Sequence, residues 1–126
     1  MPAIPSRSQT PGTGPRLVIR IDLAGGARIG PGKIALLQAI AASGSISGGG
    51  RAMKMSYRRA WELVEDLNRH FGSPVVSTAA GGSGGGGARL TEAGNRLVSA
   101  YRAIEAATNA ASARHLAAIA EIHDGT

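Results

Sequence analysis

The sequence predicts a small α+β domain that is mainly helical. The chain has 126 residues, a length that favours one domain. Three segments place apolar residues at spacings of three and four, the pattern of amphipathic helices. Two β-type runs are each followed by glycines and a short return run, which predicts two β-hairpins.

The two ends of the chain differ from this domain in composition. Residues 1–15 contain four of the six prolines and predict a disordered tail. The domain itself is expected over residues 16–122, and residues 123–126 are expected to fray.

The first hairpin and the first helix come next in the chain. Residues 17–23 form a β-type run that ends at Gly25 and Gly26, and residues 27–29 read as the return strand. The break at residues 30–32 is followed by a helix, with Gly44 as its C-terminal cap. Its predicted apolar face consists of Ile34, Leu37, Ile40 and Ala41.

Two further helices follow Gly44. The stretch Ser45-Ile46-Ser47 is an N-cap signal and predicts a short helix through the glycines at positions 48–50, although each interior glycine costs about 1 kcal/mol relative to alanine. Small residues there permit a close helix crossing, for which alanine would usually serve as well. Ser56 is the expected N-cap of a longer helix that Gly72 and Pro74 end. The apolar stripe of this helix is Tyr57, Ala60, Trp61, Val64, Leu67 and Phe71.

The second hairpin consists of residues 75–78, a glycine-rich tip at 81–87 and a return strand at 88–90. Thr91 is the expected cap of a final helix over residues 91–122. Spacings of four and three along this helix resemble a heptad seam. The seam residues are Leu97, Tyr101, Ile104, Thr108 and Ala111.

A short helix, a turn of three to four residues and a longer helix have the layout of a helix-turn-helix. In that motif the second helix enters the DNA major groove with its N-terminal residues against the bases. Arg58 and Arg59 stand there, and arginine can bind guanine through two hydrogen bonds. Ser56 and Tyr57 add hydroxyls that can bind a phosphate or a base edge. The second hairpin then takes the place of a wing, whose bare glycines can approach phosphates.

The charge distribution agrees with a polyanionic partner. Residues 1–60 contain nine Lys/Arg and one acid, whereas residues 61–126 contain five arginines and seven acids. A basic half of this kind favours nucleic acid, although a solvated basic surface is the plain alternative. Lys33 and Arg28 are possible additional phosphate contacts, with plain surface roles as the alternative.

Residues 30–101 resemble the N-terminal winged helix-turn-helix domain of ModE-type regulators, which are molybdate-responsive transcription factors related in this domain to the LysR family. The resemblance rests on GPGKIALLQAIAASGSIS (30–47), MSYRRAWELVEDLN (55–68), TAAGGSGGGGARLTEAGNRLV (78–98) and Tyr101-Arg102. It implies a homodimer that binds double-stranded DNA sequence-specifically at a two-fold operator.

The predicted functional residues fall into two sets. The DNA-binding set is Ser47, Lys54, Ser56, Tyr57, Arg58, Arg59, Glu62, Gly84, Gly85 and Arg89. Within it, Glu62 is expected to pair with the neighbouring arginines rather than to read cytosine. The dimer set is Leu97, Tyr101, Ile104 and Thr108.

Two sites, the glycines at 48–50 and Lys54, depart from the family pattern. Residues 48–50 are glycines where the family usually has small alanine-type residues, and Lys54 stands where the turn often has glycine. A left-handed lysine would cost about 1–2 kcal/mol. The sequence also shows no counterpart of the family's separate oxyanion-binding domain, so no cofactor and no small-molecule ligand are expected within this chain.

Other function classes find little support. The chain has no cysteine, His70, His115 and His123 lack a metal-ligand spacing, and the glycine-rich tip lacks the lysine of a P-loop. No apolar run approaches the roughly 20 residues of a membrane span. We therefore expect a cytoplasmic, nucleoid-associated protein that is not an enzyme, has no metal and does not bind a membrane. Two alternatives stay open: a protein-interaction or oligomerisation module that does not bind DNA, and direct oxyanion sensing.

Overall fold

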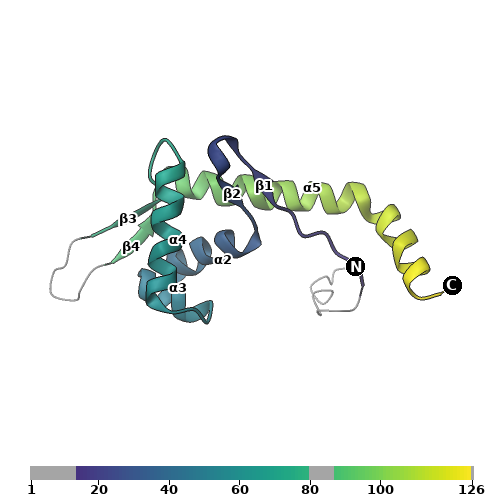
Figure 1. The fold of residues 1–126 in the computed structure, drawn as a ribbon, viewed down its shortest axis with the longest axis horizontal. Helices are drawn as coiled ribbons and strands as arrows, with labels where there is room; N and C mark the ends of the chain where they lie inside the picture. Colours follow the sequence, from purple (N-terminus) through teal and green to yellow (C-terminus); the bar gives the residue numbers. More distant parts are fainter. Residues whose placement is uncertain (1–13, 80–86, 126) are drawn as a thin grey trace. The chain divides into compact units, whose positions relative to one another are not determined.

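A computed structural model describes residues 14–79 and 87–125 of the chain. Most of the predicted tail and the predicted wing tip, including Gly84 and Gly85, lie outside these residues. The described residues belong to two compact units, one of residues 18–103 and the other of residues 14–17 and 104–125. The elements, shown in Figure 1, are β1 (Ile21–Asp22), a 3-10 turn (Ala24–Gly26), β2 (Arg28–Ile29), α2 (Pro31–Ser43), α3 (Ile46–Ala52), α4 (Tyr57–His70), β3 (Val76–Thr78), β4 (Ala88–Leu90) and α5 (Glu92–His123).

This architecture is mainly helical and contains two antiparallel hairpins. It is compatible with the predicted α+β class and with a winged-helix-like fold. In the first hairpin Ile21 stands opposite Ile29, as expected from the return run. Its strands have only two residues each, so most of the β-type run at residues 17–23 is not strand.

Helix α2 supplies much of the core of the larger unit. Its buried residues are Ile34, Leu36, Leu37 and Ile40. The prediction of Ala41 on this face was wrong, since Ala41 is exposed. Because α2 is apolar on nearly all sides, residue spacing alone does not distinguish Leu36 from Ala41. Gly44 ends the helix in the left-handed conformation, as predicted, and its N–H donates to the Ile40 carbonyl at 2.8 Å.

Helix α3 is the predicted short helix, and its glycines have a steric reason. The Ser45 hydroxyl caps it by accepting from the Gly48 N–H at 2.8 Å. A Cβ added at Gly49 would lie 2.5 Å from Ile40 Cγ1 and 3.0 Å from the Ile40 backbone nitrogen. One added at Gly50 would lie 3.0 Å from the Cβ of Ala60. The expectation that alanine would serve as well was therefore wrong, because α2 and α4 approach α3 too closely.

The second hairpin follows α4 as predicted. Ser77 pairs with Arg89 in an antiparallel register, and the Ala88 N–H donates to the Gly44 carbonyl at 2.8 Å. This bond joins β4 to the end of α2, so the hairpin is anchored to the helical part of the unit. Figure 1 shows β3 and β4 side by side.

Helix α5 begins at the predicted cap. The Thr91 hydroxyl accepts from the Gly94 N–H at 3.0 Å and donates to the Pro74 carbonyl at 2.7 Å. A Cβ at Gly94 would collide with the Val75 carbonyl oxygen. Thr91 and Gly94 thus let the start of α5 pack directly against the backbone that leads into β3.

Tyr101 does not lie on an exposed seam. It is 1% exposed within one chain, and its hydroxyl donates to the Ile19 carbonyl at 2.6 Å. Its placement in a dimer interface was therefore wrong, since an aromatic ring at a core-facing position of α5 fills the chain's own core. Leu97 is partly buried against that core, whereas Ile104, in the other unit, is 41% exposed.

Candidate nucleic-acid interface

The predicted base-reading residues are held at the start of α4. Ser56 caps this helix, and its hydroxyl accepts from the Arg59 N–H at 3.0 Å. Tyr57 is 57% exposed, and the side chains of Arg58 and Arg59 are 89% and 59% exposed. Because Ala60 and Val64 face the core, the arginines are directed away from it. The structure therefore presents all three side chains to solvent on one turn.

The charges in the first turn of α4 interact unfavourably with the helix dipole when no ligand is bound. The positive end of a helix dipole favours acidic residues, each by about 0.3–1 kcal/mol, yet the first turn of α4 contains none. It contains two arginines instead. Residues 45–61 also include Arg51 and Lys54 and no acid. An anion bound at this turn would remove the conflict.

Lys54 occupies the turn between α3 and α4. Within residues 14–79 and 87–125, Lys54 is the one residue other than glycine that has a positive φ, 59°. The turn thus keeps the left-handed geometry expected where glycine is usual, and the lysine bears its strain. Lys54 is exposed, so its ammonium group is available to solvent next to the start of α4.

A hollow joins α3, α4 and the second hairpin. Tyr57 and Trp61 make an edge-to-face contact with ring centroids 6.3 Å apart. The hollow beside them is lined by Ser45, Ile46, Ser47, Tyr57, Trp61, Thr78, Ala79, Gly87 and Ala88. The structure therefore brings Ser47 and Tyr57, two predicted site residues, next to the hairpin.

Arg89 lies on a different part of the hairpin. It is exposed on β4 opposite Ser77 and lines a second hollow together with Thr78 and Gly44. Arg89 is therefore close to the hairpin residues that face Tyr57, but it does not line the Tyr57 hollow itself.

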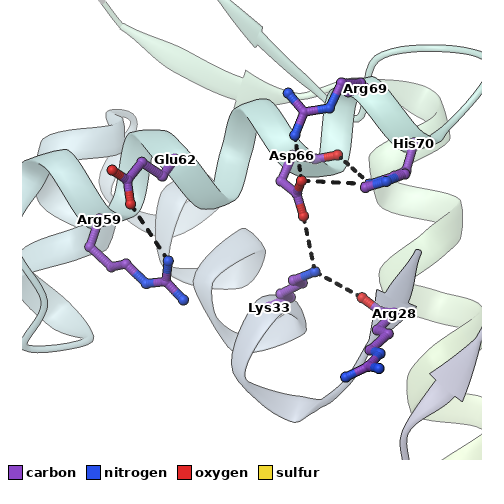
Figure 2. Close-up of polar contacts among 7 residues, drawn as sticks. All are labelled: Arg28, Lys33, Arg59, Glu62, Asp66, Arg69 and His70. Atoms are coloured by element: carbon purple, nitrogen blue, oxygen red, sulfur yellow. Dashed lines mark hydrogen bonds and ion pairs between the residues drawn. The ribbon is translucent and has the colours of Figure 1, made fainter. Parts of the chain in front are cut away.

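Glu62 pairs with both arginines, as predicted. Its Oε2 lies 3.4 Å from Arg58 Nε, and its Oε1 lies 3.6 Å from Arg59 Nη1. Figure 2 shows the pair with Arg59. Since residues three and four apart on a helix are neighbours, the carboxylate lies between the two guanidinium groups.

A second acidic centre lies one turn further along α4. Asp66 accepts a hydrogen bond from Arg69 and lies 3.5 Å from Lys33 Nζ, as Figure 2 shows. Burial raises the pKa of Asp66, but the Arg69 hydrogen bond and the surrounding positive charges outweigh burial and hold the pKa below its ordinary value of 3.8.

Lys33 is engaged in this cluster. Its ammonium group also donates to the Arg28 carbonyl at 2.9 Å, and its side chain is 22% exposed. The geometry thus gives Lys33 a structural role in linking α2, β2 and α4, whereas the side chain of Arg28 is exposed.

The chain resembles curated proteins that are named as molybdenum-pterin-binding proteins or as ModE. It is 51% identical over 81 residues to the molybdenum-pterin-binding protein MopB of Rhodobacter capsulatus, a match covering 64% of this chain and 30% of MopB. It is 45% identical over 71 residues to the DNA-binding transcriptional dual regulator ModE of Escherichia coli (strain K12), covering 56% of this chain and 27% of that protein. The molybdenum transport protein ModE of Azotobacter vinelandii is 38% identical over 85 residues, covering 68% of this chain and 32% of its own length.

Over part of its length the chain is similar to MopB and to ModE. No protein-family model matches it. It spans about 30% of the length of the curated relatives that it matches. This similarity accords with a ModE-type N-terminal domain, the resemblance that residues 55–68 and 78–98 carry.

The structure adds residues that the predicted site omitted. Arg51 is exposed on α3 and its guanidinium donates to the Ser47 hydroxyl at 3.3 Å. Thr78 lines the same hollow as Tyr57. Arg51 was detectable as a cation one helical turn after Ser47, whereas the position of Thr78 depends on how the hairpin folds back.

In residues 14–79 and 87–125, no cluster of three or more His, Asp or Glu side chains has a geometry suited to a metal ion. No helix in these ranges is both long and apolar enough to span a membrane.

Proposed function

We propose that this chain is a transcriptional regulator that binds double-stranded DNA sequence-specifically. The observation that carries the proposal is the exposure of Arg58 and Arg59 at the N-terminus of α4, where the helix dipole disfavours them. Local choices that reduce stability are expected at functional sites. The Escherichia coli relative is named as a DNA-binding regulator, which supports the same function.

In this proposal α4 lies in the major groove and Arg58 and Arg59 contact base edges. A good bidentate contact discriminates between bases by about 1–3 kcal/mol. Ser47, Lys54 and Arg89 contact phosphates, which fix the position of the protein on the duplex. The second hairpin acts as the wing, and Thr78 and Tyr57 border the surface between it and α4.

We also propose that two copies bind a two-fold operator. Leu97, Ile104 and Thr108 are the proposed dimer contacts on α5, with Tyr101 removed because it is buried within one chain. Two copies of α4 spaced about 34 Å apart would read half-sites separated by one helical turn of DNA.

The test of DNA binding starts with selection of bound sequences from random duplexes. The selected duplex is then titrated with the wild type, with Arg58→Ala/Arg59→Ala and with Arg96→Ala/Arg114→Ala. The last variant removes the same charge from exposed positions of α5. We expect the α4 variant to bind at least tenfold more weakly than the control. Equal affinity of the two variants would contradict the assignment of base contacts to α4.

A module that binds another protein rather than DNA is distinguished by salt. Neutralisation of phosphates releases counterions, so DNA affinity falls steeply as salt rises. If the protein binds DNA, it should bind a random duplex at low salt, and this affinity should be lost between about 50 and 200 mM salt. Absence of binding at low salt would favour a protein partner.

A DNA-binding role also places the protein with the chromosome in the cytoplasm.

The names of several relatives refer to molybdenum. We propose that the chain itself takes no oxyanion and no other cofactor. Calorimetric titration with molybdate should then give no heat of binding, and a saturable signal would assign an oxyanion site to this chain.

The dimer is tested by light scattering on the wild type and on Ile104→Asp. A charge buried in the seam is expected to shift the protein toward monomer, because an unpaired buried charge is strongly unfavourable. Ser99→Asp, at an exposed α5 position outside the predicted seam, is the control. A monomeric wild type would remove the proposal.

A further inference from the structure

One carboxylate serves both proposed base-reading arginines. Each oxygen of Glu62 faces a different guanidinium, Arg58 at 3.4 Å and Arg59 at 3.6 Å. The Glu62 side chain is 51% exposed, so both pairs lie in contact with water. Figure 2 shows Glu62 extended from α4 toward the guanidinium of Arg59.

The surrounding charges make Glu62 the local counter-ion. No acid occurs between Asp22 and Glu62 in the sequence. The next helical turn contains Asp66, which is engaged by Arg69 and Lys33. The start of α4 therefore combines two cations with one carboxylate, and the positive charge that a phosphate meets depends on whether Glu62 keeps its contacts.

These pairs are suited to exchange. Exposed ion pairs contribute little to stability, because water screens them and ordering two long side chains costs entropy. The order of charges is also unfavourable, since a cation that precedes an acid along a helix interacts less well than the reverse arrangement. The contacts of Glu62 can therefore be broken at small cost by a ligand that satisfies both arginines better.

Random and selected duplexes offer different contacts to the two arginines in place of Glu62. A random duplex offers phosphates, which attract the arginines without fixed geometry. A matching site offers bidentate acceptors on guanine, which are stronger and directional. A guanidinium binds guanine through two of its five N–H donors, so Arg58 can keep its Nε contact with Glu62 while it contacts a base. A phosphate contact without fixed geometry gives up that pair, and the loss of the Glu62 contacts therefore weakens mainly non-specific binding.

We infer that Glu62 is a specificity-determining residue that competes with DNA phosphates for Arg58 and Arg59. The inference rests on the proposed function. Glu62 here acts through the arginines and not by accepting a hydrogen bond from cytosine, because both carboxylate oxygens already face guanidinium groups.

The experiment compares Glu62→Gln with Glu65→Gln. Glu65 is exposed on the same helix three residues further on, so its substitution changes the charge of α4 equally. The probes are the duplex selected by the wild type and a shuffled duplex of the same composition. We expect Glu62→Gln to bind the shuffled duplex about fivefold more tightly than Glu65→Gln does, as expected from two weak pairs. The affinity of Glu62→Gln for the selected duplex should change less. The ratio of its affinity for the selected duplex to its affinity for the shuffled duplex therefore falls.

A second readout needs no DNA. The NMR signal of the Arg58 Nε–H group should shift in Glu62→Gln and stay in place in Glu65→Gln, since Nε is the atom that faces the carboxylate. An unshifted signal would overturn the inference.

The binding data separate the two proposals. Equal effects of the two substitutions on the shuffled duplex would overturn the role of Glu62 while leaving DNA binding intact. Weaker binding of the selected duplex by Glu62→Gln, with the shuffled duplex unchanged, would overturn it in favour of direct base reading. A wild type that binds neither duplex at low salt would overturn the proposed function as well.

Discussion

The side-chain amide of Asn68 binds both backbone polar groups of Val76. Its Oδ1 accepts from the Val76 N–H and its Nδ2 donates to the Val76 carbonyl, each at 3.1 Å. The same Oδ1 accepts from the Val75 N–H at 2.8 Å. Asn68 therefore takes the place of a neighbouring strand at the start of β3, and it ties the second hairpin to the helix that begins with Arg58.

Replacement of Asn68 by alanine should destabilise the domain by about 2–3 kcal/mol, because backbone groups of two buried residues lose their partners. Urea denaturation measures this loss. Asn95→Ala, at an exposed position of α5, should change the free energy of unfolding by no more than about 0.5 kcal/mol. Equal stability of the two variants would show that water replaces the Asn68 amide.

Gly49→Ala should destabilise the domain even though alanine is the better helix former. The new methyl group would meet Ile40 at 2.5 Å, and overpacking of this kind costs about 1–3 kcal/mol. Gly32→Ala is the matched control, since a Cβ at this position in α2 meets no atom within 4 Å. It should leave thermal stability unchanged or raise it by up to about 1 kcal/mol. A Gly49→Ala protein as stable as Gly32→Ala would mean that α2 and α3 separate at little cost.

Lys54→Gly should raise stability and lower DNA affinity together. Glycine relieves the left-handed strain at φ 59°, a gain of about 1 kcal/mol, but the substitution removes a proposed phosphate contact. Thermal unfolding and a salt-dependent titration measure the two effects. Lys54→Asn, which tolerates the left-handed conformation better than lysine, should behave similarly. Unchanged affinity would exclude Lys54 from the DNA surface.

Asp66 should make the domain sensitive to acid. Its pKa in the folded state lies below the ordinary value of 3.8, so the carboxylate stabilises the folded state at neutral pH. That contribution is lost as the pH falls from about 4 through the folded-state pKa. In Asp66→Asn the free energy of unfolding should therefore fall less steeply below about pH 4 than in the wild type. Asp124→Asn, at the exposed end of the chain, is the control and should keep the wild-type slope.

The sequence predicted the elements where local signals are strong. Caps at Ser45, Ser56 and Thr91 and the end of α2 at Gly44 follow from side-chain and backbone chemistry within a few residues. The charged pair of Arg58 with Glu62 follows from helical spacing.

Tertiary contacts decided the remainder. Tyr101 fits a heptad seam by spacing, but its ring lies inside the domain, and only the position of the segment around Ile19 reveals this. Gly94 and Asn68 have their roles because the backbone near Val75 passes close to them. Residue spacing along the chain does not indicate such a close approach, so the roles of these two residues were not predicted.

The bond between the Tyr101 hydroxyl and the Ile19 carbonyl joins positions 82 residues apart. During synthesis the segment around Ile19 leaves the ribosome long before Tyr101 does, and its final partner is therefore absent while α2, α3 and α4 emerge. Any fragment that stops after β4 also lacks this partner. The smallest piece suitable for independent study must consequently include the first half of α5 as well as the helices that meet DNA in our proposal.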